Sequence, residues 1–153
     1  NQRHPRHGSP RRVLAAALVG LREAGLKVQA VAPVIASRPL GPSQRSYANG
    51  AALVKTKLAP PALLALLQGQ ERSFGRIRRG GRWRARVLDL DIVLWDGGIW
   101  ATPDLQIPHP LFARRHFVLG PAARIAPGWR DPLTGLTLAR LHARLTRPRP
   151  LPR

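Results

Sequence analysis

The stretch VLDLDIVLW, residues 87–95, places two carboxylates inside a run of large apolar residues. Such residues predict a buried strand, and side chains at positions i and i+2 of a strand leave the same face. We therefore expect Asp89 and Asp91 to point inward, side by side. Two like charges held that close on an apolar strand are costly unless a positive group compensates them. The sequence leaves two candidates for that group, which are arginines and a metal ion.

Length and composition limit the class of protein. The chain has 153 residues, of which 44% are hydrophobic, enough for one domain with a core. We assign residues 1–146 to that domain and expect the Pro/Arg-rich residues 147–153 to be a disordered tail. The absence of Cys excludes disulfides and thiolate metal sites, and the sequence has no signal peptide and no apolar run of membrane-spanning length. We expect a soluble cytoplasmic monomer with no membrane partner.

The charge balance points toward polyanions without choosing among them. The chain carries 26 Lys and Arg against 7 Asp and Glu, a formal net charge of +19. Nucleic acid, a membrane surface and nucleotide phosphates would all suit that charge. However, only three of the basic residues are lysines, and the chain is also rich in Ala, Gly and Pro, a profile that GC-rich coding can produce. An ordinary solvated basic surface is therefore an equal alternative.

Upstream of residue 87, apolar spacing and turn residues predict helix 10–24, strand 27–37, strand 47–58 and a helix from Pro60 to about Glu71. Ser9-Pro10 gives the first helix an N-cap followed by proline, and Gly25 ends it. The two strands could pair with each other. Downstream, we expect a short strand near Ile99-Trp100, a helix around 115–124 and a small helix near 137–145.

The segment between the second helix and residue 87 is dense in charge and glycine. Residues 73–87 contain six arginines, two adjacent glycines and Trp83. This composition predicts a mobile surface loop, and guanidinium groups suit bidentate contacts with phosphate. The loop leads directly into the carboxylate-bearing stretch. Arginines, an aromatic ring and two carboxylates together indicate a site for a nucleotide and its divalent metal.

These motifs, taken in order, resemble a known family. They are Arg76-x-Arg78, Arg82-Trp83-x-x-Arg86-x-Leu88-Asp89-Leu90-Asp91-Ile92 and Ile107-Pro108-His109-Pro110, preceded by Ser37-Arg38-Pro39-Leu40-Gly41-Pro42, by Tyr47-Ala48-Asn49 and by Glu71. The series is similar to hydroxymethyl-dihydropterin pyrophosphokinase of folate biosynthesis, over about residues 9–127. The chain departs from the family's usual pattern at Arg84-Ala85, Asp104 and Gln106.

The resemblance implies a reaction. Two Mg²⁺ ions would link Asp89 and Asp91 to the triphosphate of ATP, the co-substrate. The hydroxymethyl oxygen of 6-hydroxymethyl-7,8-dihydropterin would attack the β-phosphorus and release AMP. Catalysis of this kind depends mainly on positioning and charge stabilisation.

The resemblance also implies roles for individual residues. Arg76, Arg78 and Arg86 would hold phosphates or close the loop, and Trp83 would cover the site. Nucleotide contacts would come from Glu71, Ile92, His109 and Arg115, and pterin contacts from Leu40, Tyr47, Asn49 and Phe117.

For the fold, the resemblance implies an α/β (α+β) three-layer sandwich on a ferredoxin-like antiparallel sheet. This agrees with the helix–strand–strand–helix–strand order predicted from the residues. The family begins with a strand ending in Gly-Ser-Asn, whereas this sequence begins at Asn1-Gln2-Arg3-His4. We therefore expect a form without the first strand, which would be poorly stable and weakly active.

Two other interpretations remain. A nucleic-acid-binding module on a ferredoxin-like sheet would explain the charge, but phosphates would be repelled by Asp89 and Asp91 without metal, and few aromatic residues are available for stacking. Nucleic acid is thus disfavoured as a partner. A catalytically inactive scaffold would differ from the enzyme only at the departures above. Separately, Asp89 and Asp91 could serve only in structural ion pairs with arginines.

Overall fold

The computed structural model describes residues 6–37, 47–75 and 87–148, and these form four α-helices, six short strands and one 3₁₀ turn. Their order is α1 (Pro10–Glu23), β1 (Lys27–Val31), β2 (Ile35–Ser37), β3 (Tyr47–Asn49), β4 (Ala52–Lys55), α2 (Pro60–Ser73), β5 (Trp100–Ala101), β6 (Gln106–Ile107), η1 (Phe112–Arg114), α3 (His116–Ile125) and α4 (Leu138–Thr146). The predicted class of mixed helices and antiparallel strands is confirmed. Within this part of the chain, no helix is long and apolar enough to cross a membrane.

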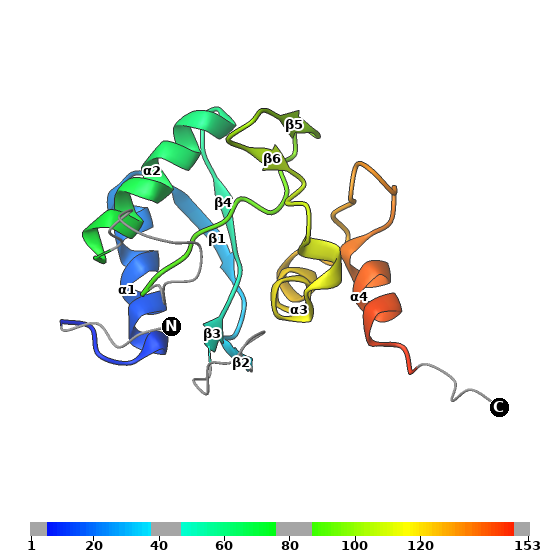
Figure 1. The fold of residues 1–153 in the computed structure, drawn as a ribbon, viewed down its shortest axis with the longest axis horizontal. Helices are drawn as coiled ribbons and strands as arrows, with labels where there is room; N and C mark the ends of the chain where they lie inside the picture. Colours follow the sequence, from blue (N-terminus) through cyan, green and yellow to red (C-terminus); the bar gives the residue numbers. More distant parts are fainter. Residues whose placement is uncertain (1–5, 38–46, 76–86, 149–153) are drawn as a thin grey trace.

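The helices lie on both sides of the central strands. In Figure 1, α1 and α2 lie to the left of the ladder formed by β1 and β4, whereas α3 and α4 lie to its right. Helix α1 contacts α2 and β1, and α3 contacts β2, β3 and β4. This arrangement gives the three layers expected of the sandwich.

The two upstream strands do pair, but each is divided. β1 pairs antiparallel with β4, with Lys27 opposite Lys55, and β2 pairs antiparallel with β3, with Ser37 opposite Tyr47. The predicted strand 27–37 breaks at residues 32–34, where Pro33 has no backbone N–H for a ladder. The described strands form three separate two-stranded ladders. The third joins β5, which was predicted, to β6, which was not.

Helix α1 follows its predicted bounds closely. Val13, Ala17 and Leu21 recur every four residues and are buried on one face. The helix ends because Gly25 adopts a left-handed conformation, with φ of 86°. The N–H of the next residue, Leu26, then donates to the carbonyl of Leu21 at 3.0 Å, as in a Schellman ending.

The prediction of a buried strand over residues 87–95 is wrong in its hydrogen bonding and in the burial of its carboxylates. The segment lies outside every ladder of the described residues, and Asp89 and Asp91 are exposed. A strand requires a neighbouring strand to complete its backbone hydrogen bonds, whereas here the N–H of Leu90 donates to the Glu71 side chain and the carbonyl of Val93 accepts from the N–H of His109. The predicted alternation of burial is present, because Leu88 is only 2% exposed and Leu90 is half-buried, whereas the aspartates between and after them are exposed.

The same segment connects three hydrophobic clusters. Leu88 belongs to the cluster of Val13, Ala17 and Phe74. Leu90 and Ile92 pack against the cluster of Leu21, Leu26 and Leu67, and Val93 and Leu94 against that of Phe112, Leu119, Leu138 and Leu141. Burial of these side chains at about 25 cal/mol per Å² of apolar surface fixes the segment without a strand partner.

The C-terminal helices pack on each other. Leu119 of α3 is fully buried beside Leu138 of α4. Both helices match their predicted positions, residues 115–124 and 137–145, within one residue. Thr137 caps α4 by accepting from the N–H of Arg140.

Candidate active site

Two hydrogen bonds fix the backbone on either side of Asp91. The Glu71 carboxylate, which is 2% exposed on α2, accepts from the N–H of Leu90 at 2.8 Å. The carbonyl of Val93 accepts from the N–H of His109 at 3.0 Å. Asp91 therefore projects from a short stretch that is held at both ends. The second bond also brings the Pro-His-Pro segment against the carboxylate-bearing stretch, as a nucleotide site would require.

A cavity of about 290 Å³ opens beside Asp91. Its lining combines apolar side chains with a few polar groups: Leu64, Asp91, Ile92, Pro103, Asp104, Leu105, Gln106, His109 and Pro110. Small-molecule sites commonly have this composition and volumes of about 300–1,000 Å³, and this cavity is close to the lower end of that range. Three predicted site residues, Asp91, Ile92 and His109, thus share one cavity.

The imidazole of His109 has a defined hydrogen-bonding arrangement. Its Nδ1 accepts from the N–H of Leu111 at 3.3 Å. In the neutral ring this assigns the proton to Nε2, which becomes a hydrogen-bond donor. A donor beside Asp91 suits a phosphate oxygen of a nucleotide.

The carboxylates fit a magnesium ion held together with a substrate. Asp89 and Asp91 are exposed and alternate with the packed side chains of Leu88, Leu90 and Ile92, which places both on the outer side of the segment. Among the residues with described positions, no group of three or more His, Cys, Asp or Glu could hold a metal ion. Mg²⁺ often binds one or two carboxylates and completes its octahedral shell with water and substrate phosphates. The donor set here is of that kind.

Three of the four predicted pterin residues lie on β3 and at the start of α3, which contact each other. Tyr47 and Asn49 are half-buried on β3, and the Asn49 side-chain amide donates to the Ser37 hydroxyl at 2.7 Å. Phe117 is half-buried on α3, and the Arg115 guanidinium lies over its ring at 6.0 Å. These contacts give the pterin candidates a shared neighbourhood and place Arg115 against Phe117.

The remaining predicted site residues lie outside the described part of the chain. They are Leu40, Arg76, Arg78, Trp83 and Arg86.

Sequence reasoning missed several contributors. The Ser37 hydroxyl orients the Asn49 amide, and its signal in the sequence is a polar residue at the end of an apolar strand. Leu64, Leu105 and the prolines of the cavity lining carry no individual signal in the sequence. Asp104 and Gln106 were noted only as departures, and both line the cavity.

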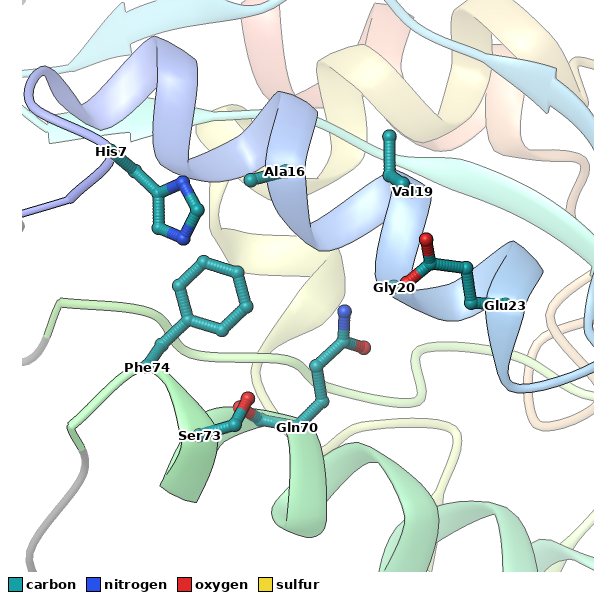
Figure 2. A pocket seen from close by; sticks show the side chains of 8 residues that line it. All are labelled: His7, Ala16, Val19, Gly20, Glu23, Gln70, Ser73 and Phe74. Carbon is teal, nitrogen blue, oxygen red and sulfur yellow. The ribbon is translucent and has the colours of Figure 1, made fainter.

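A second cavity, of about 390 Å³, lies between α1 and α2 and contains none of the predicted site residues. Figure 2 shows the Gln70 amide pointing from α2 toward α1 and the His7 ring beside the ring of Phe74. The Gln70 amide donates to the carbonyl of Ala17, and Gly20 leaves room for it. These groups join two helices, so the cavity beside Asp91 is the better candidate for chemistry.

Comparison with known proteins gives a consistent result. Residues 6–127 match the family model described as 7,8-dihydro-6-hydroxymethylpterin-pyrophosphokinase. A Synechocystis protein named 2-amino-4-hydroxy-6-hydroxymethyldihydropteridine pyrophosphokinase is 42% identical over 118 residues, which are 77% of this chain and 60% of that protein. A Pseudomonas aeruginosa protein of the same name is 42% identical over 125 residues, 80% of this chain and 76% of the relative. The folic acid synthesis protein FOL1 of Dictyostelium discoideum is 40% identical over 104 residues, which are 67% of this chain but only 15% of its own.

Proposed function

The chain belongs to the 7,8-dihydro-6-hydroxymethylpterin-pyrophosphokinase family, and we propose that it transfers pyrophosphate from ATP to the hydroxymethyl group of 6-hydroxymethyl-7,8-dihydropterin. The products are AMP and the pterin diphosphate. The observation that carries this proposal is the meeting of Asp91, Ile92 and His109 in one cavity, with Asp89 on the same outer side of the segment.

The reaction is a displacement at the β-phosphorus. The pterin hydroxymethyl oxygen forms a bond to that phosphorus and loses its proton, and the bond between the β-phosphorus and the oxygen of the α-phosphate breaks. AMP leaves with the electron pair of that bond. The protein forms no covalent bond in this scheme, so its contribution is positioning and charge stabilisation.

Asp89 and Asp91 are the residues that would hold Mg²⁺. Bound there, Mg²⁺ would neutralise phosphate charge and polarise the phosphoryl oxygens. The Glu71–Leu90 and His109–Val93 hydrogen bonds fix the backbone on either side of Asp91, which lines the cavity. Because the Nδ1 of His109 accepts from the N–H of Leu111, Nε2 is the ring nitrogen that donates to a phosphate oxygen of the nucleotide.

The pterin ring binds on the side of β3 and α3. Phe117 stacks on the ring, Asn49 contributes amide contacts in an orientation set by Ser37, and Tyr47 lies two residues away on the same strand face. Arg115, held near the Phe117 ring, contacts the nucleotide. The enzyme works as a monomer in the cytoplasm, where both substrates are soluble.

Product analysis of the full chain tests the proposal. Mass spectrometry and phosphorus NMR of a reaction with ATP, Mg²⁺ and 6-hydroxymethyl-7,8-dihydropterin should show AMP and a pterin carrying two phosphates in equal amounts. Formation of ADP with a pterin monophosphate, or of phosphate without a modified pterin, would overturn it.

A further inference from the structure

The C-terminal unit, residues 112–148, has a one-sided charge composition. It holds seven arginines and a single carboxylate, Asp131. Asp131 is 3% exposed and accepts hydrogen bonds from the N–H of Leu133 at 3.0 Å and from the Thr134 hydroxyl at 2.7 Å. That carboxylate is therefore used inside a turn. The surface of the unit presents guanidinium groups with no carboxylate of its own to balance them.

Helix α4 presents part of this charge in a regular row. Its apolar side, Leu138 and Leu141, is buried against Leu119 of α3. Arg140 and Arg144 are exposed on the helix, and Arg147 is exposed directly after its end. Arg140 and Arg144, which are four apart, lie on one face of the helix about 6 Å apart along the axis, and Arg147 follows in extended backbone. The row can thus contact successive anionic groups along a strand.

This row lies apart from the proposed active site. Figure 1 shows α4 on the outer side of α3, away from β5, β6 and the segment that carries Asp89 and Asp91. It also lies beyond residue 127, where the match to the family model ends. The enzymatic proposal therefore leaves the row unused, and an inference about it does not depend on that proposal.

We propose that Arg140, Arg144 and Arg147 form a sequence-independent binding surface for the phosphate backbone of a nucleic acid. Guanidinium groups bind phosphates bidentately, and an unbalanced cationic surface gains affinity by releasing counterions from the backbone. Nucleic acid was disfavoured from the sequence because Asp89 and Asp91 would repel phosphates, and these carboxylates lie on another surface. A membrane is the weaker partner, because α4 has already buried Leu138 and Leu141, and Leu145 is the one leucine that this helix leaves exposed for insertion.

Binding of the full chain to a labelled single-stranded RNA of mixed sequence, without Mg²⁺ or ATP, tests this proposal. The test variant is R140E/R144E/R147E, and the matched control is R11E/R12E/R22E, which changes the same number of exposed arginines on α1. By fluorescence anisotropy we expect the α4 variant to lose at least about tenfold in affinity near 0.1 M salt. The slope of log affinity against log salt should fall by about 2, since each phosphate contact contributes about 0.7 with single strands. The control should change affinity by less than about threefold, because salt screens charges beyond about 10 Å.

Three outcomes would overturn the proposal. The first is that the wild-type chain does not bind the RNA at low salt. The second is that the α4 variant and the α1 control lose RNA affinity equally. The third is that the α4 variant binds RNA as the wild type does but no longer binds vesicles of anionic phosphatidylserine. Thermal melts establish that each variant is folded. If the glutamate variant is not folded, R140Q/R144Q/R147Q removes the charge without reversing it, and a loss of affinity there supports the proposal on the same terms.

Discussion

The buried carboxylate of Glu71 accepts a hydrogen bond of 2.8 Å from the backbone N–H of Leu90, the residue between Asp89 and Asp91. This contact replaces the ladder bond that a strand neighbour would have supplied. It couples the end of α2 to the two carboxylates of the proposed active site. The identity of residue 71 should therefore affect both stability and catalysis.

Glu71→Ala should destabilise the chain, because it leaves the N–H of the half-buried Leu90 without this acceptor. We expect a loss of about 1–3 kcal/mol in the free energy of unfolding and a lower kcat. Glu71→Gln keeps a side-chain oxygen at the same place and should retain most of the stability and most of the kcat. Chemical denaturation and steady-state kinetics of the two variants check this, and equal losses in both would show that the charge matters more than the acceptor.

Substitution of Phe117 should weaken binding of the pterin and leave binding of the nucleotide unchanged. Phe117→Ala removes the ring that we propose stacks on the substrate, so the KM for the pterin should rise about two- to tenfold, given that an aromatic pair contributes about 0.5–1.5 kcal/mol. The KM for ATP should stay within a factor of two. Phe117→Tyr keeps the ring and serves as the control. A matching rise in the KM for ATP would place Phe117 elsewhere in the site.

The α3–α4 core should be a major source of stability. Leu119 is fully buried against Leu138 and Leu141, so Leu119→Ala should cost about 2–5 kcal/mol of unfolding free energy. Leu133, which is 68% exposed, provides a matched control, and Leu133→Ala should change stability by less than about 0.5 kcal/mol. Urea denaturation of both variants distinguishes them, and a small effect at Leu119 would mean that this cluster contributes little.

Helices and individual contacts were predictable to different degrees. The bounds of α1 followed from a proline start, apolar residues spaced by four and a C-terminal glycine, all of which are local signals. The segment 87–95 was read as a strand because its residues alternate, and the alternation is real. Its backbone pairing depends on which segment lies beside it, which the segment's own residues do not encode.

Two short motifs predicted three of the residues that line the cavity beside Asp91. Asp91, Ile92 and His109 were predicted and do line one cavity. The Glu71–Leu90 contact spans nineteen positions, and nothing in the sequence marks Leu90 as its partner. The contribution of Ser37 likewise required the register in which β2 meets β3. Contacts of this kind arise from tertiary packing.

The most direct measurement of the central claim is AMP release from ATP and 6-hydroxymethyl-7,8-dihydropterin as a function of Mg²⁺ in four chains: wild type, Asp89→Asn, Asp91→Asn and Asp96→Asn. Asp96 is exposed in a nearby turn outside the cavity lining, so its substitution removes the same charge without touching the proposed site. We predict Mg²⁺-dependent release of AMP by the wild type and by Asp96→Asn. The rate of AMP release should fall by at least about a hundredfold in Asp89→Asn and in Asp91→Asn, a size typical of lost electrostatic stabilisation at a reacting group. The melting temperatures of these variants should be unchanged. Full Mg²⁺-dependent turnover in either Asp89→Asn or Asp91→Asn would contradict the account.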